Sequence, residues 1–512
     1  MRRRARRLTG APVFAVALCV AVTVRAMAQC PDGTPPPCRS ARGVAAPPPS
    51  SVAVLYFDNA SRDTNDVYLA DGLSEEIISR LSGIERLTVR SRFLVRRYRG
   101  VALDDPAAVG RALNVSYFVS GTIRRAGGRL RVSAELIRAA GGAQVWGQEF
   151  EQSGGDVFAI QEAVAREVAT GIVGRLLPAE RQTLAVRPTQ SAAAYEAFLR
   201  GNFHMARRDS AGMRRAITEF ETALRLDPSY TDALSRIALV YGIATANGTH
   251  LGFPTDTTVA RALRNATEAV SRAPQSSDAW EAMGVARLAA EPRHLSVARP
   301  ALERALELDP ANAEAHHLLG FTLEMLGEDS AGLAHDRQAL AIEPARPVTL
   351  MHLAQEAIKV GRYAEGRRWT DSVLTFDRDY WTGRGFLPPL LLAAGDTAGA
   401  RRELARWAEV PSLRSVMALA ELALTPHGED SAAVRAWRAA VRAAVPSDVP
   451  VSQASGAVLL MMLATGDADA VLAVFEAMRP RGAFLHYYMT FRLFDPIRAD
   501  PRFQRLFVET TP

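Results

Sequence analysis

The 512-residue chain is almost free of lysine: Lys359 is the only one, and arginine supplies the other basic residues. P-loop proteins and protein kinases hold nucleotide phosphates with a lysine, but Lys359 follows no glycine-rich loop and falls within a predicted helix. The chain also has no His-Glu-x-x-His zinc motif and no Gly-x-Ser-x-Gly nucleophile motif. We therefore predict that the protein is not an enzyme and has no catalytic, cofactor-binding or metal-binding residues.

The apolar stretch at the N-terminus is too short for a stable membrane span. It covers residues 11–24, which is 14 positions, whereas a transmembrane helix needs about 20. An arginine-rich start precedes it and Ala26-Met27-Ala28 follows it, an order typical of a cleaved secretory signal peptide. We predict that residues 1–28 are removed on export to the periplasm or the extracellular space. An anchor in the inner membrane, facing the periplasm, is the alternative.

A net positive charge is missing from the predicted mature chain. The formal charge of +6 comes from 61 basic and 55 acidic residues. Residues 1–28 contain six of the arginines and no acid, so their removal leaves 55 basic residues against 55 acidic ones. Recognition of nucleic acid by charge needs a basic excess. We therefore predict no nucleic-acid partner.

Cysteine is scarce as well, with three in the chain. Cys19 lies in the predicted signal peptide, which leaves Cys30 and Cys38. In an exported protein such a close pair favours a local disulfide. Two thiols without a nearby histidine make only half of a metal site, and free or intermolecular thiols are the alternative. The segment 29–50 around them is rich in proline and alanine, and we interpret it as an extended linker.

Residues 51–177 have the alternating pattern of an α/β domain. The apolar run Val52–Phe57 is typical of a buried strand, and leucine and isoleucine at helical spacing between Val67 and Leu81 indicate a helix. The elements predicted in the order β-α-β-α-β-β-β-α are 52–57, 67–81, 87–91, 105–113, 116–125, 129–137, 144–151 and a helix from 156. We interpret the polar stretch that follows, 178–191, as a hinge.

Five segments of this domain resemble the FlgO domain and the amino-terminal domain of TolB. They are Ser51–Phe57, Tyr68–Ile78, Gly121–Arg125, Val145-Trp146 and Phe158–Gln161, in that order. The resemblance covers nearly all of 51–177 and implies a TolB amino-terminal-like α/β fold. In bacterial relatives such a domain often precedes tetratricopeptide-repeat (TPR) arrays in cyclase-, kinase- or winged-helix-linked regulators. Here we expect only the signal peptide and the linker before it.

Residues 192–480 repeat a pair of helices. Pro310 and Pro344 each follow the second helix of a pair and are 34 residues apart, which is the period of a TPR. Small residues recur in the first helices, where they let two helices approach closely. The pattern resembles the TPR family and predicts an all-α TPR solenoid of about eight pairs, with C-terminal capping helices in 481–512. The expected packing residues are Trp280, Gly284, Pro310, Leu319, Gly320 and Pro344.

In TPR proteins that bind peptides, the first helix of each pair lines a concave groove, so the resemblance implies such a groove here. Setting Trp280, His316 and Leu350 at equivalent positions assigns to its lining Glu281, His317, Phe321, Glu324, Met351 and Gln355. An aromatic ring and a methionine suit apolar anchoring, and the polar groups suit orientation of a peptide. The alternative is that these are ordinary groove residues without a partner.

Two further clusters have ligand-binding residue types. His316 and His317 are adjacent, so on a helix they point about 100° apart and cannot simply share a metal ion. Five arginines lie close together and could bind an anion or an acidic partner, or could form a solvated face of the α/β domain. They are Arg90, Arg92, Arg96, Arg97 and Arg99.

Together these features predict an exported, non-enzymatic scaffold of the cell envelope that binds a protein or peptide partner through its TPR groove. The alternative is a regulatory or sensor module, related to the cyclase-, kinase- or winged-helix-linked TPR proteins, that acts in trans on a separate effector.

Overall fold

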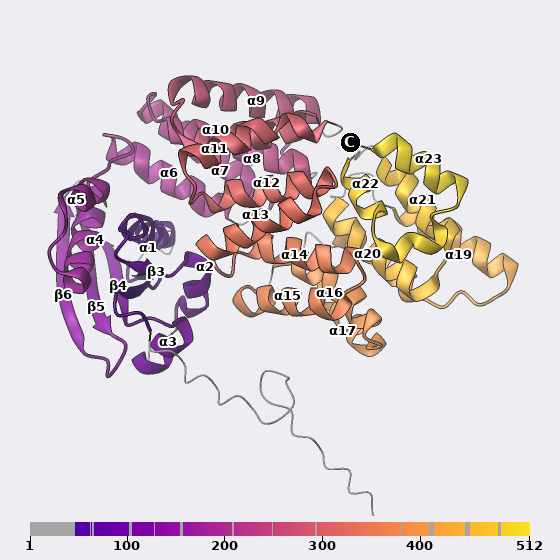
Figure 1. Cartoon of the computed structure of the whole chain (residues 1–512), viewed down its shortest axis with the longest axis horizontal. Coiled ribbons are helices and arrows are strands. Elements are labelled where there is room, and N and C mark those ends of the chain that lie inside the picture. Colours follow the sequence, from indigo (N-terminus) through magenta and orange to yellow (C-terminus); the bar gives the residue numbers. More distant parts are fainter. Residues whose placement is uncertain are drawn as a thin grey trace, which may run out of the picture. The chain divides into compact units, whose positions relative to one another are not determined.

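The computed structural model describes residues 47–511, with gaps at 62, 64–65, 102–104, 127–128, 154–156, 207–208, 248, 292–293, 379, 409–413, 446–450 and 480–482. The predicted signal peptide, most of the proline-rich linker and the Cys30–Cys38 pair lie outside the described residues. The chain from Pro47 to Pro512 packs as one unit, and Figure 1 labels its helices and strands.

The N-terminal part is built on a mixed β-sheet. Its strands are β1 (Ser51–Val54), β2 (Asp58–Asn59), β3 (Thr88–Val89), β4 (Tyr117–Ala126), β5 (Arg129–Arg138) and β6 (Gln144–Ser153). The order is β3-β1-β4-β5-β6, with β2 pairing beside β4. β1 runs parallel to β3 and β4, whereas β4, β5 and β6 form antiparallel ladders. All four residues of β1 are buried, as expected of a parallel strand covered on both faces.

Helices follow the strands in the predicted order. They are α1 (Val67–Ser82), α2 (Arg92–Val95), α3 (Pro106–Leu113) and α4 (Val157–Val173). Helix α3 begins at its proline, and the Asp105 carboxylate accepts a hydrogen bond from the Ala108 amide at 2.9 Å, which caps the helix. The eight predicted elements are all present. The short β2, α2 and the 3₁₀ turn Arg96–Tyr98 were not predicted.

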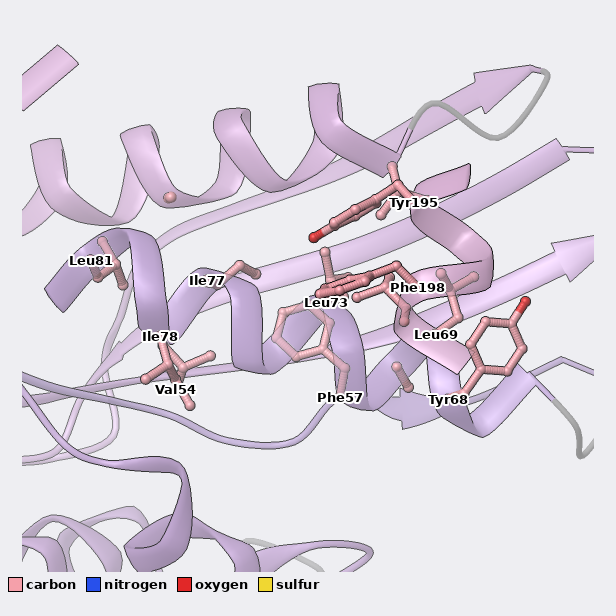
Figure 2. Close-up of a cluster of buried hydrophobic side chains, with 14 of the residues drawn as sticks. Val54, Phe57, Tyr68, Leu69, Leu73, Ile77, Ile78, Leu81, Tyr195 and Phe198 are labelled. Atoms are coloured by element: carbon pink, nitrogen blue, oxygen red, sulfur yellow. The ribbon is translucent and has the colours of Figure 1, made fainter. Parts of the chain in front are cut away.

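Helix α1 joins the sheet to the first repeat. Its apolar face carries Leu69, Leu73 and Ile77, each at most 1% exposed. Figure 2 shows this face meeting Tyr195 and Phe198 of the next helix, α6 (Ala192–Met205). One hydrophobic core therefore runs from the strands into the first TPR helices without interruption.

The expected hinge is wrong for residues Pro178–Leu184, which form helix α5. Proline at the first helical position and Glu180, which accepts a hydrogen bond from the Leu177 amide at 2.7 Å, start the helix. Glu180 also pairs with Arg86 at 2.6 Å, and Leu184 is 1% exposed. Buried leucine and a paired carboxylate hold this polar-looking segment against the α/β domain.

Between Ala192 and Met478 the described residues form eight consecutive helix pairs. Together with α6 they are α7 (Ser210–Leu226), α8 (Thr231–Asn247), α9 (Thr255–Arg272), α10 (Ser277–Ala290), α11 (Arg299–Leu308), α12 (Ala313–Met325), α13 (Asp329–Ile342), α14 (Pro347–Lys359), α15 (Tyr363–Phe376), α16 (Trp381–Ala393), α17 (Thr397–Trp407), α18 (Arg414–Leu424), α19 (Ser431–Ala444), α20 (Val451–Thr465) and α21 (Ala468–Met478). This agrees with the predicted number of pairs.

The turns inside successive pairs keep the repeat period. Gly327, Gly361 and Gly395 are spaced 34 residues apart and have φ angles of 82°, 79° and 81°. Each lies between the first and second helix of its pair, where the chain must adopt the left-handed conformation that glycine tolerates best. The TPR period is therefore present in the backbone as well as in the sequence.

The expected packing glycines lie where helices cross. A Cβ on Gly284 would lie 2.5 Å from Leu302 Cδ2, and a Cβ on Gly320 would lie 2.9 Å from the Gly332 carbonyl oxygen. Leu319 is 2% exposed, and the Trp280 indole donates a hydrogen bond to the Pro274 carbonyl at 2.9 Å. Pro310 and Pro344 both follow the C-terminus of a second helix.

The C-terminal region departs from simple stacking. Helix α20 packs against both α16 and α18, and a Cβ on Gly456 would lie 2.3 Å from the Gly385 carbonyl oxygen. Residues 481–512, predicted to cap the solenoid, include α22 (Ala483–Met489), a 3₁₀ helix Arg492–Ile497 and α23 (Pro501–Thr510). Helix α22 contacts α12. Among the described helices, none combines the length and apolarity that a membrane crossing requires.

Candidate functional site

A buried polar cluster lies where α12, α13 and α14 meet. His352 of α14 is 3% exposed and lies between two carboxylates: its Nε2 is 2.8 Å from Glu324 Oε2 and its Nδ1 is 2.8 Å from Asp336 Oδ2. His317 of α12 approaches the same aspartate, with its Nδ1 3.3 Å from Asp336 Oδ1. Two histidines and two carboxylates from three helices thus share one site.

The crossing of α12 and α13 brings these groups together. Gly320 and Gly332 face each other so closely that a Cβ on Gly332 would lie 2.3 Å from Glu324 Cγ. Asp336 lies one turn beyond Gly332 on α13, and His317 and Glu324 flank Gly320 on α12. The glycines required by the hairpin therefore also set the depth of the polar cluster.

Burial and charge act against each other on these groups. Burial would raise the pKa of Asp336, but the charge of His352 and the contact with His317 lower it to about 2. Burial raises the pKa of Glu324 to about 7, although the charge of His352 opposes it. Burial favours neutral His352, yet Asp336 and Glu324 raise its pKa well above the ordinary value. His352 is thus balanced mainly by Asp336, and Glu324 keeps its proton to higher pH.

A second group of polar side chains closes one side of the cluster. The Tyr487 hydroxyl of α22 donates a hydrogen bond to Glu356 Oε1 at 2.7 Å, and Lys359 Nζ donates to Glu356 Oε2 at 3.4 Å. The ring centroid of Phe321 lies 5.1 Å from that of His352 and 6.4 Å from that of Tyr487. The single lysine of the chain is therefore paired inside the solenoid.

Four of the six predicted groove residues lie in the interior rather than on an open lining. Glu281, Glu324 and Met351 are at most 3% exposed and Gln355 is 9% exposed. Asn312 donates a hydrogen bond to Glu281 at 2.9 Å, and Met351 lies close to α16 at Gly383. The reason is that helix α14 is buried along its whole length, with Tyr487 of α22 against Glu356.

His317 and Phe321 are the two predicted lining residues that keep partial exposure. The residue of α14 that approaches them is His352 instead of Met351, so the assumed equivalence was one position off. His317 and His352 are 35 residues apart, close to one repeat. Comparing titratable residues at that spacing is the one sequence signal that pairs them. Sequence reasoning missed His352, Asp336 and Glu356 as members of a site.

The arginine cluster is paired with the chain's own groups. Arg99 lies 2.7 Å from Asp71 of α1, and Arg92 lies 3.3 Å from Glu75. Arg96 reaches Asp377, at the end of α15, at 3.5 Å. The remaining members, Arg90 and Arg97, donate to the backbone carbonyls of Leu113 and Ala112. The arginines therefore form neither a purely solvated face nor a free anion site.

Two family models match separate parts of the chain. Residues 49–167 match the second domain of HilA/YgeH-like transcriptional regulators, and residues 301–332 match a tetratricopeptide repeat. The second match agrees with the helix pairs and the turn glycines, so the chain contains TPR repeats. The first names a different family from FlgO and TolB, and that resemblance stays a prediction.

A curated relative and two solved structures are similar over part of the chain. A Rhizobium meliloti (strain 1021) protein named "Putative adenylate cyclase 3" is 32% identical over 212 residues, which cover 40% of this chain. The chain spans about a third of that relative's length, 36%. A thermophilic TPR protein of Thermus thermophilus is 23% identical, with a TM-score of 0.34 over 39% of this chain and 100% of that one. PilW, a type IV pilus biogenesis factor, is 17% identical, with a TM-score of 0.31 over 42% of this chain and 93% of that one.

Proposed function

We propose that the protein is an exported, non-enzymatic scaffold of the cell envelope whose TPR hairpins bind a protein partner. The observation that carries this proposal is the repeat itself: turn glycines 34 residues apart within eight helix pairs, together with the TPR match at 301–332. Stacked hairpins present extended surfaces that proteins use for peptide recognition.

The partner is proposed to contact the solenoid at Phe321 and His317. These side chains are half-buried beside the polar cluster, so a partner would find an aromatic ring next to an imidazole. Such a surface suits an extended segment with one apolar anchor and a nearby polar group. Met351 is not part of this surface, because its side chain is 2% exposed.

Site-specific photocrosslinking tests this location. A p-benzoylphenylalanine at position 321 keeps an aromatic ring in place, and the same group at position 508 is the control, since Val508 is 71% exposed on α23. We expect a defined crosslinked protein from position 321 and none in common from position 508. Identical crosslinks from both positions, or none from 321 in cells, would contradict the proposed surface.

Export is tested separately by the N-terminus of the mature protein. Mass spectrometry of the protein from the envelope fraction should find Gln29 first, as the Ala26-Met27-Ala28 motif predicts. An intact Met1 in that fraction would favour the anchored alternative.

A regulatory module is the second candidate. It is supported by the match of 49–167 to a domain of transcriptional regulators and by the similarity to a protein named as an adenylate cyclase. The resemblance of 51–177 to FlgO and TolB, which we also propose, is compatible with either function. Protease added to intact spheroplasts should digest an exported scaffold, whereas a module acting on a cytoplasmic effector would be protected.

A further inference from the structure

We propose that His317, Asp336 and His352 bind one divalent transition-metal ion and thereby tie together two successive TPR hairpins. His317 comes from α12, Asp336 from α13 and His352 from α14. A ligand atom from each lies within 4.8 Å of the others. The inference concerns these three helices only and does not depend on the identity of a partner.

The atoms face one another as ligands of a common ion would. Nδ1 of His352 is 2.8 Å from one oxygen of Asp336, and Nδ1 of His317 is 3.3 Å from the other. The aspartate therefore lies between the two imidazoles. The two imidazole rings are nearly perpendicular, at 83°, with centroids 5.6 Å apart. Both nitrogens can direct lone pairs toward one point without a change in the helices.

The donor types favour zinc or a neighbouring transition metal. Imidazole nitrogen and carboxylate oxygen are ordinary Zn²⁺ ligands, and three protein ligands leave a fourth position for water. Oxygen-rich sites suit Ca²⁺ or Mg²⁺ better. Glu324 lies 2.8 Å from Nε2 of His352, so its charge keeps the proton on that nitrogen and leaves Nδ1 for the metal, as outer carboxylates do for metal-bound histidines.

The hydrogen bonding of the cluster is a second, independent observation. Among the described residues, Asp336 Oδ2, both nitrogens of His352 and both carboxylate oxygens of Glu324 are buried without a hydrogen-bond partner. The 2.8 Å contacts between them bring the atoms close but do not have hydrogen-bond geometry. Buried polar atoms are rarely left in this way. A cation between Asp336 and His352 would satisfy the aspartate and one histidine nitrogen.

A neighbouring group of possible ligands fits less well. Glu324, His352 and Glu356 also lie close enough together. However, Glu356 already accepts hydrogen bonds from Tyr487 and from the lysine ammonium of Lys359, so its negative charge is balanced within the protein. His317 is also 13% exposed, which gives an ion entering the first site a ligand near the surface.

Isothermal titration calorimetry with ZnCl₂ tests the site. The mature full-length chain is used after treatment with EDTA, with Cys30→Ser and Cys38→Ser so that the two thiols bind no zinc. We expect one Zn²⁺ per chain. His317→Ala should weaken binding by more than about 100-fold, since loss of an outer partner alone costs 10–100-fold, and Glu324→Gln should fall within that smaller range.

Two controls separate a metal site from a folding effect. His317→Ala should leave the circular dichroism and the melting temperature in EDTA unchanged, because this side chain is at the edge of the cluster. His294→Ala removes an exposed histidine and should leave the zinc affinity unchanged. Absence of Zn²⁺ binding by the parent protein, or parent-like affinity in folded His317→Ala, would overturn the proposal. So would loss of binding in His316→Ala alone, which would place the ion at the His316–His335 pair, whose Nδ1 atoms are 2.9 Å apart.

Discussion

Helices α8 and α14 are both first helices of their pairs and both are largely buried, but their buried side chains differ. The interior of α8 is almost wholly apolar and includes Ile237, Val240 and Tyr241. The interior of α14 includes His352, Glu356 and Lys359. Removing charges from water costs several kcal/mol per ion unless they are paired. The apolar region is therefore explained by stability alone, whereas the polar region requires a further role.

The largest effect is expected where the apolar region is broken. Phe220 of α7 is fully buried, 5.5 Å from the ring of Phe198, and lies against Gly201. Phe220→Ala should destabilise the protein by about 3–5 kcal/mol because it leaves a cavity in the core shared with the α/β domain. Denaturant unfolding followed by circular dichroism measures this. A loss below about 1 kcal/mol would mean that the two parts do not share a core.

Overpacking in the polar region should cost less. Gly320→Leu would place a side chain against the Gly332 carbonyl and Asp336, and we expect a loss of about 1–3 kcal/mol. Gly361→Asn is the matched control, because Gly361 has φ 79° and open space around it, and asparagine tolerates that conformation. Equal melting temperatures for both variants would show that α12 and α13 do not cross at Gly320.

The pH dependence of stability separates a buried carboxyl from the apolar helices around it. Burial raises the pKa of Glu281 to about 7, with Asp278 adding to the rise and Arg236, Arg346 and the Asn312 bond opposing it. The folded state then binds a proton more tightly than the unfolded state, so stability is lost as pH rises from about 4.5 to above 7. Glu281→Gln should therefore gain about 1–2 kcal/mol at pH 8 and little at pH 4.5, in urea unfolding at both pH values. A gain independent of pH would contradict this account.

The smallest effect is expected for charges at the surface. Arg96 lies 3.5 Å from Asp377 and its side chain is 43% exposed. Arg96→Ala should cost less than about 1 kcal/mol, and the loss should shrink in high salt. Melting at low and high ionic strength tests this. A cost comparable to that of Gly320→Leu would mean that this contact holds the α/β domain against the repeats.

The period of the solenoid could be predicted from the sequence because it depends on local chemistry. Turn glycines, prolines after second helices and capping residues such as Asn312 and Asp467 act within a few residues of their own position. The alternation of apolar residues likewise predicted the strands and helices of residues 51–177. The helix α5 was missed because its two apolar contacts come from other parts of the chain.

The polar cluster was decided by tertiary structure alone. His317, Asp336 and His352 meet only because α12 and α13 cross at Gly320 and Gly332, a depth that no local pattern encodes. The cover over α14 depends on Tyr487, which is 131 residues from its partner Glu356. Adjacent histidines in the sequence point apart on a helix, whereas histidines one repeat apart point into the same space. The sequence by itself determined the hairpins and their spacing, and the packing between hairpins determined which side chains meet.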